Sequence, residues 1–143
     1  MKIYFCGSIC GGREDVEWYE GIVSHLKTYG EVVSERVSQR DVNPKKENGR
    51  ESFIHNRNLE WLVSSDVVVA EVSTPSLGVG YEIGRAVEHG KKVLCLYRND
   101  ASKQLSSMIR GCPDVTVANY ATLEQAKHSI DEFFENMRLE SLR

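Results

Sequence analysis

The chain has 143 residues, of which 41% are hydrophobic and 27% charged, with a formal net charge of −3 and a pI near 5.8. This length and composition are typical of one globular domain, because no segment has the low hydrophobicity and heavy charge bias of a disordered tail. We therefore expect a single domain over residues 1–143. The mild negative charge argues against binding to polymeric nucleic acid, which needs clustered cations, and leaves a small anionic ligand open.

The start of the chain and its cysteines indicate an intracellular protein with no membrane segment. The apolar run after Lys2 is too short for a signal peptide, and no later window approaches a membrane-spanning length. The four cysteines lack paired CxxC spacing, and two lie inside apolar runs: Cys6, Cys10, Cys95 and Cys112. We expect buried thiols in a reducing compartment rather than a metal or redox site at Cys6 and Cys10. No metal and no cofactor are expected.

Strand and helix patterns alternate along the first half of the chain. In order, they predict a strand Lys2–Cys6, a glycine loop Gly7–Gly12, an amphipathic helix Arg13–Tyr29, a strand Glu31–Ser34, a polar surface loop Val37–Ser52 and a helix from Phe53.

The second half continues the alternation. It predicts a central apolar strand Asp66–Val72, a loop Ser73–Gly80, a helix that ends at Gly90, a strand Lys92–Tyr97, a short helix Lys103–Ile109, a strand Val115–Ala118 and a helix Leu123–Leu139. Right-handed crossovers then give an α/β fold with a single doubly wound, five-stranded parallel sheet, Rossmann-like or flavodoxin-like, and helices on both faces. Because ligands bind at the carboxyl ends of such strands, the loops at 7–12, 71–80 and 97–107 are the candidate site.

The first loop places small residues between a strand and the start of a helix, where free amides and the helix dipole favour an anion. It matches neither the GxGxxG dinucleotide pattern nor a P-loop. A purely structural turn explains its glycines as well as phosphate binding does.

The second loop carries a carboxylate with suitable neighbours. Gly78 and Gly80 let a ligand approach the backbone, Ser76 can donate a hydrogen bond, and Glu82 is expected in the first turn of a helix. The helix dipole stabilises a carboxylate there even without function. A glutamate in this position can also attack the anomeric carbon of a sugar and form a covalent intermediate, as in retaining glycosidases.

Five segments of the chain resemble a known family. They are Tyr4–Ile9, Ile54–Leu62, Ser65–Val72, Pro75–Ala86 and Leu105–Gly111, and in the same order and spacing they are similar to the 2'-deoxynucleoside 5'-monophosphate N-hydrolases, which belong with the nucleoside 2-deoxyribosyltransferases. The resemblance implies hydrolysis of a deoxynucleoside monophosphate to free base and 2-deoxyribose 5-phosphate. It also implies a homodimer in the cytoplasm, or in the nucleus as well.

The resemblance assigns roles to individual residues. It implies that Glu82 is the nucleophile and that Tyr4 orients it. The implied substrate-binding residues are Gly7, Ser8, Ile9, Cys10, Ser76 and Gly78, with Ser106 and Met108 reaching the site of a neighbouring subunit. From the residues alone, Tyr4 would be a core aromatic and Ser106 a surface hydroxyl.

Two positions depart from the family pattern. Asn58 stands where the family has an Asp that handles a proton, and an amide can orient a group but cannot titrate. General acid help is worth about a hundredfold or more, so Asn58 predicts a slow or inactivated enzyme unless Glu71 substitutes. Cys10 stands where close relatives carry an Arg that contacts the phosphate, which weakens phosphate binding unless Arg13 reaches in.

Three alternatives remain open at this point. One is base exchange between deoxynucleosides, in which a second base intercepts the glycosyl intermediate. Another is a non-catalytic nucleotide sensor, which Asn58 makes reasonable. The third is a flavodoxin-like signalling or redox module, which the residues favour least because no acidic receiver pocket and no cofactor motif is evident.

Overall fold

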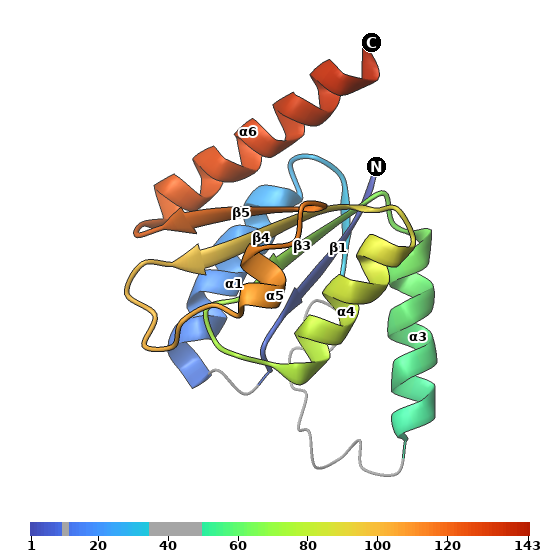
Figure 1. Cartoon of the computed structure of the whole chain (residues 1–143), viewed down its shortest axis with the longest axis vertical. Helices are drawn as coiled ribbons and strands as arrows, with labels where there is room; N and C mark the ends of the chain where they lie inside the picture. Colours follow the sequence, from blue (N-terminus) through green and yellow to red (C-terminus); the bar gives the residue numbers. More distant parts are fainter. Residues whose placement is uncertain (10–11, 35–49) are drawn as a thin grey trace.

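The computed structural model describes residues 1–9, 12–34 and 50–143, and only the backbone of residues 12–14. Strands and helices alternate along this part of the chain (Figure 1). They are β1 (Lys2–Gly7), α1 (Gly12–Leu26), β2 (Glu31–Val33), α3 (Glu51–Ser64), β3 (Val67–Glu71), α4 (Leu77–Glu88), β4 (Lys92–Arg98), α5 (Ser107–Arg110), β5 (Val115–Tyr120) and α6 (Leu123–Ser141). The α/β alternation predicted from the sequence is confirmed.

The strands form one parallel sheet in the order β2-β1-β3-β4-β5. The chain goes from β1 to β2 on one side of β1, and β3, β4 and β5 follow one another on its other side. Connections that leave β1 and β3 therefore depart toward opposite faces, and a crevice opens at the carboxyl ends of these two strands. Gly7 pairs with Glu71 across them, so the first and second candidate loops begin side by side.

Side chains from the two faces of the sheet build two separate cores. Because successive residues of a strand point to opposite faces, Phe5 and Val69 pack with α1 and α6, while Tyr4 and Val68 pack with α3 and α4. In Figure 1, α4 and α5 lie in front of the sheet and α1 lies behind it. Every residue of β3 is buried, as expected of a central strand covered on both faces.

Several element boundaries differ from the prediction; helix α4, for example, begins at Leu77, inside the loop predicted over Ser73–Gly80. The helix expected over Lys103–Ile109 is reduced to α5, because Ser106 caps its first turn and the Tyr97 hydroxyl donates to the carbonyl of Lys103 at 2.5 Å, in the segment before it. Helix α3 begins at Glu51, inside the expected polar loop. Most of that predicted loop, residues 35–49, lies outside the described residues.

Cys6 and Cys95 are buried in the core on the α3/α4 face, as the sequence indicates. Burial raises the pKa of the Cys95 thiol to about 12 and raises that of Cys6 well above its ordinary value, so both stay protonated. Cys10 lies outside the described residues. In the part of the chain that the structure describes, no group of three or more His, Cys, Asp or Glu side chains is arranged to hold a metal ion.

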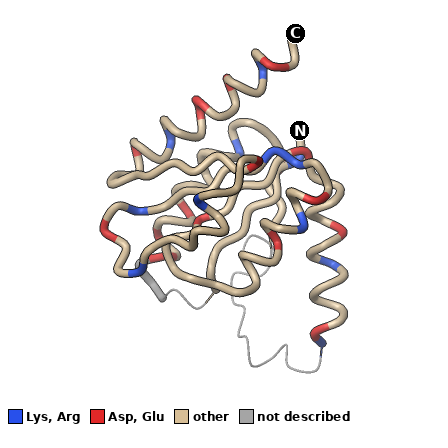
Figure 2. Tube along the Cα trace, viewed as in Figure 1, with Lys and Arg blue, Asp and Glu red and all other residues tan. Residues whose placement is uncertain are grey.

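Charged residues of both signs are interspersed along α3 and α6 (Figure 2). Within the described ranges, none of the helices is both long and apolar enough to cross a bilayer.

Candidate active site

Glu82 and Tyr4 meet at the crevice between β1 and β3. Tyr4 of β1 is 1% exposed and lies on the face of the sheet that α3 and α4 cover. Its hydroxyl donates a hydrogen bond to Oε2 of Glu82, a half-buried residue of α4. The phenol fixes one carboxylate oxygen and therefore the direction of the group. The negative charge of Glu82 also contributes, after burial, to the raised pKa of Cys6, which places the carboxylate close to the end of β1.

The position of Glu82 within its helix differs from the prediction. Ser76 is the N-cap of α4, and its Oγ accepts a hydrogen bond from the backbone N–H of Val79 at 3.2 Å. Leu77 is thus the first helical residue, and Glu82 falls in the second turn rather than the first. The helix dipole weakens beyond the first turn, so it contributes less to this carboxylate than the prediction assumed, and the carboxylate accepts a hydrogen bond from Tyr4.

Glu82 lines two hollows. The smaller, of about 20 Å³, is bounded by Tyr4, Phe5, Cys6, Gly7, Ile9 and Ser34. The larger, of about 140 Å³, is bounded by His55, Asn58, Leu59, Leu62, Gly78, Tyr81 and Arg85. The carboxylate therefore faces space at the ligand end of the sheet, as a nucleophile must.

The first loop contributes Gly7, Ser8 and Ile9 next to Glu82. A Cβ on Gly7 would lie 2.8 Å from Cζ of Tyr19, so packing alone requires a glycine there. Ser8 is buried, whereas Ile9 is 42% exposed and borders the smaller hollow. Cys10 and the side chain of Arg13, which the sequence predicts to affect phosphate binding, lie outside the described residues.

The second loop is open on its outer side. A Cβ on Gly78 would meet only Oγ of Ser76, at 3.8 Å, and one on Gly80 would meet nothing within 4 Å among the described atoms. Contacts within the described chain therefore do not account for these two glycines, unlike Gly7. Their small size fits close approach by a molecule from outside.

A third hollow, of about 570 Å³, lies between the loop after β3 and α5. Ser76, Ser106 and Met108 line it together with apolar side chains that include Leu77, Ile83, Leu105 and Ile109. In the described part of this chain, Ser106 and Met108 border neither hollow at Glu82. The structure thus brings Ser106 and Met108 to Ser76 but not to Glu82 of the same chain.

Asn58 lies on α3 and borders the larger hollow opposite Glu82. Its Oδ1 accepts a hydrogen bond from Nε of Arg57 at 3.2 Å. The predicted catalytic residues Glu82, Tyr4 and Asn58 are therefore brought together, with Glu82 between the other two.

Glu71 does not substitute for the missing acid, and that expectation was wrong. The alternation along β3 turns Glu71 to the α1 face, away from Glu82, and its side chain is fully buried. It accepts hydrogen bonds from the Tyr120 hydroxyl at 2.5 Å and from the backbone N–H of Ser73 at 2.6 Å, and it faces Arg98 at 3.4 Å. Burial raises the pKa of Glu71, and the hydrogen bonds and the charge of Arg98 offset part of this increase.

Sequence reasoning missed three residues at the larger hollow: His55, Tyr81 and Arg85. His55 stands three positions before Asn58, a spacing that puts both on one face of a helix. Tyr81 and Arg85 are four apart around Glu82, and their hydrogen bond of 2.6 Å follows the same rule. Helical spacing around Asn58 and Glu82 was therefore the available signal.

The chain is similar in sequence to known proteins over nearly its whole length. Residues 3–137 match the family model described as nucleoside 2-deoxyribosyltransferase. The chain is 48% identical over 143 residues to a 5-hydroxymethyl-dUMP N-hydrolase of Esox lucius, covering 96% of this chain and 98% of the relative. It is 50% identical over 139 residues to a protein of the same name from Mus musculus, and the match covers 94% of this chain and 80% of the mouse protein.

Among solved structures, a 2-deoxyribosyltransferase from Bacillus psychrosaccharolyticus superposes with a TM-score of 0.68 at 18% identity, covering 89% of this chain and 90% of that one. This likeness concerns the fold, and the matches in sequence concern the family. The chain belongs to the nucleoside 2-deoxyribosyltransferase family.

Proposed function

We propose that this chain hydrolyses the N-glycosidic bond of 2'-deoxynucleoside 5'-monophosphates, giving free base and 2-deoxyribose 5-phosphate. The observation that carries the proposal is the carboxylate of Glu82, held by Tyr4 and facing two hollows at the carboxyl ends of β1 and β3. The names of the relatives from Esox lucius and Mus musculus support the reaction and suggest 5-hydroxymethyl-dUMP as the first substrate to test.

In the proposed mechanism, Glu82 attacks C1′ of the deoxyribose as the base departs. The glycosyl ester that forms is then hydrolysed by water, so that one difficult displacement becomes two easier ones. The hydrogen bond from Tyr4 holds the carboxylate in the direction of attack, which lowers the entropic cost of reaching the transition state.

The 5′-phosphate is proposed to lie over the loop after β1. The backbone of Gly7, Ser8 and Ile9 leads into the start of α1, where unpaired amides favour an anion. Ser76 and Gly78 lie at the start of α4, on the neighbouring loop. Because the oxygen of Ser76 accepts the helix-capping hydrogen bond, its hydroxyl hydrogen is available for a phosphate oxygen.

A second copy of the chain is proposed to cover the hollow that Ser106 and Met108 line. Leu77 is 96% exposed and Met108 is 83% exposed, at the edge of the same apolar hollow. Apolar side chains grouped in this way favour a protein partner, and a homodimer would bring Ser106 to the partner's site. Mass measurement by light scattering tests this, with Met108→Asp expected to yield monomers and the parent dimers.

The compartment is a further proposal. Free thiols at Cys6, Cys95 and Cys112 fit the reducing cytoplasm, with the nucleus as an additional location. Microscopy of the tagged protein in its source cells tests this.

The decisive experiment measures base release from deoxynucleotides, ribonucleotides and unphosphorylated nucleosides. Glu82→Ala should abolish release while the variant remains folded, and Asn58→Asp should increase it. Addition of a free second base separates hydrolysis from exchange, because exchange yields a new nucleotide. Saturable nucleotide binding by the parent and by Asn58→Asp without any base release would refute the proposal and leave a nucleotide sensor.

A further inference from the structure

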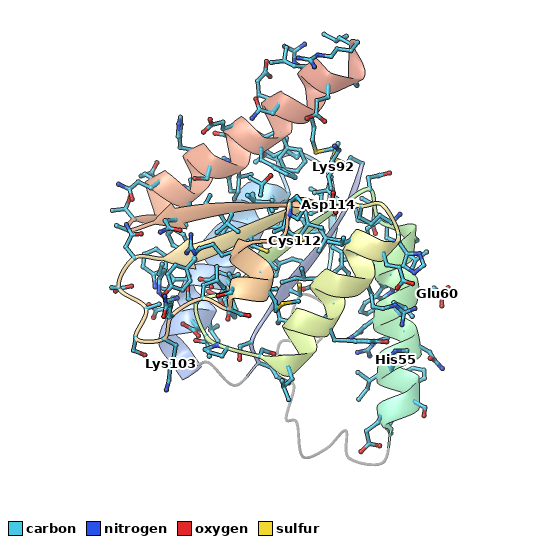
Figure 3. The ribbon with its side chains drawn as sticks, viewed as in Figure 1. His55, Glu60, Lys92, Lys103, Cys112 and Asp114 are labelled. Atoms are coloured by element: carbon cyan, nitrogen blue, oxygen red, sulfur yellow. The ribbon has the colours of Figure 1, made fainter. Side chains whose placement is uncertain are left out.

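The larger hollow at Glu82 contains a hydrogen-bonded chain of three side chains from two helices. Nε2 of His55, which comes from α3 (Figure 3), lies 2.7 Å from the hydroxyl oxygen of Tyr81 on α4. Nη1 of Arg85 donates to the same oxygen at 2.6 Å. All three border the hollow that Asn58 and Glu82 also border.

The protonation pattern of this chain follows from its partners. Nδ1 of His55 lies 2.9 Å from the acceptor Oδ1 of Asn56, so Nδ1 carries a hydrogen. Nε2 is then the nitrogen that faces the hydroxyl of Tyr81 and can exchange a hydrogen with it. When Nε2 is protonated, the oxygen of Tyr81 accepts hydrogen bonds from both His55 and Arg85. Its own hydrogen is thereby directed elsewhere, and the hollow offers the space.

We propose that Tyr81, supplied by His55, donates the proton that the departing base requires, a role that the amide of Asn58 cannot fill. The inference rests on the proposed function and names the general acid of the same site. The positive charge of Arg85 beside the phenol stabilises the negative charge that develops on its oxygen as the proton leaves.

The proton balance closes over the two steps. In the first, the C1′–N bond breaks with its electron pair on the base, a carboxylate oxygen of Glu82 bonds to C1′, the phenol proton moves to the base, and the Nε2 proton of His55 moves to the phenol oxygen. In the second, water bonds to C1′, the bond from C1′ to Glu82 breaks, and the proton lost by the water returns through Tyr81 to His55. One water is consumed and the enzyme is regenerated.

The test is a double-mutant cycle on kcat for base release from 5-hydroxymethyl-dUMP. In the parent, Tyr81→Phe should lower kcat by about a hundredfold, the usual size of general acid help, with a smaller change in KM. In the Asn58→Asp background the new carboxylate supplies the proton, so Tyr81→Phe should cost less than about threefold. His55→Gln should follow the same pattern. Tyr29→Phe, which removes a hydroxyl that donates to Asp131 on the α1/α6 side of the sheet, is the matched control and should change kcat little in either background.

A second readout isolates the proton. A 4-nitrophenyl 2-deoxyriboside 5-phosphate releases a leaving group that needs no protonation, so its turnover should be nearly the same in the parent and in Tyr81→Phe.

Equal losses from Tyr81→Phe in both backgrounds, or an equal loss with the nitrophenyl substrate, would overturn the inference, because Tyr81 would then support binding or folding. An active parent whose kcat is unchanged by Tyr81→Phe would also overturn it while leaving the proposed function intact. Base release by Asn58→Asp alone, with an inactive parent, would overturn both the inference and hydrolysis by this chain. If neither chain released base from any nucleotide, the proposed function itself would fall.

Discussion

Arg98 holds together the polar cluster on the α1 face, and its removal gives a clear stability prediction. Its guanidinium contacts Asp15 at 2.8 Å and Glu71 at 3.4 Å, and the three side chains are only 10%, 3% and 0% exposed. Burial alone would lower the pKa of Arg98, but the hydrogen bond with Asp15 and the charge of Glu71 raise it overall. Arg98→Met preserves much of the packing and leaves two buried carboxylates without their cation.

The size of the effect follows from what remains after the substitution. Removing one partner from a buried ion pair costs about 3–5 kcal/mol. Asp15 keeps a hydrogen bond from the Thr74 hydroxyl, and Glu71 keeps those from Tyr120 and Ser73, so the loss should lie near the lower end. We expect a fall of about 3 kcal/mol in the free energy of unfolding, or about 10 °C in Tm for a domain of this size.

Urea titration followed by circular dichroism measures the change, with Arg138→Met as a matched control. Arg138 also pairs with a carboxylate, Glu135, at 2.6 Å, but on the exposed surface of α6. The control should leave the midpoint nearly unchanged, because solvent screens such a pair. A loss from Arg98→Met no larger than that of the control would refute the view that this cation neutralises buried charge.

Three further predictions concern single contacts. Tyr4→Phe removes a hydrogen bond to a carboxylate, worth about 1.5–3 kcal/mol, and should lower kcat for base release by about 10- to 100-fold and Tm by about 5–10 °C; an unchanged kcat would remove Tyr4 from the mechanism. Gly7→Ala should cost about 1–3 kcal/mol in urea unfolding, because the new methyl group would lie 2.8 Å from the ring of Tyr19; an unchanged midpoint would mean that the ring moves aside freely. Glu71→Gln tests the pH dependence of stability. Because the pKa of Glu71 is higher in the folded state than its ordinary value of 4.5, the folded state binds this proton more tightly than the unfolded state does. The parent therefore loses stability as the pH rises from 4.5 through the folded pKa. The stability of Glu71→Gln relative to the parent, measured by urea unfolding between pH 4 and 8, should therefore increase with pH, and a constant difference would contradict the assignment.

Much of the fold follows from patterns that are local in the sequence. The apolar run of β3 and the three- and four-residue spacing in α1 gave the element order, and the parallel sheet follows from alternation. The short α5 could not be foreseen, because it depends on the hydroxyl of Tyr97 binding the carbonyl of Lys103. Such a contact is set by tertiary packing and leaves no periodic signal.

Some residues of the candidate site could likewise be predicted from the sequence, and others could not. The position of its loop indicated Glu82, resemblance to a family added Tyr4 and Asn58, and the structure brings the three to adjoining hollows. The hydrogen-bonded pair His55 and Tyr81 was missed because their contact spans two helices, although each stands at helical spacing from a residue already named.

Two acidic side chains near the carboxyl end of β3 show why a loop position alone does not identify a catalytic group. Glu71 ends the strand itself, and the two-residue period of the strand turns it into the α1 face, where Arg98, Tyr120 and Ser73 hold its oxygens. A carboxylate enclosed in this way cannot approach a sugar. Glu82 comes eleven positions later on a helix that packs on the other face, where the Tyr4 hydroxyl donates to it and it lines two hollows. The same edge of the sheet thus carries one carboxylate that is held by the loop after β3 and its neighbours and one that lines two hollows, and the face of the sheet decides between them.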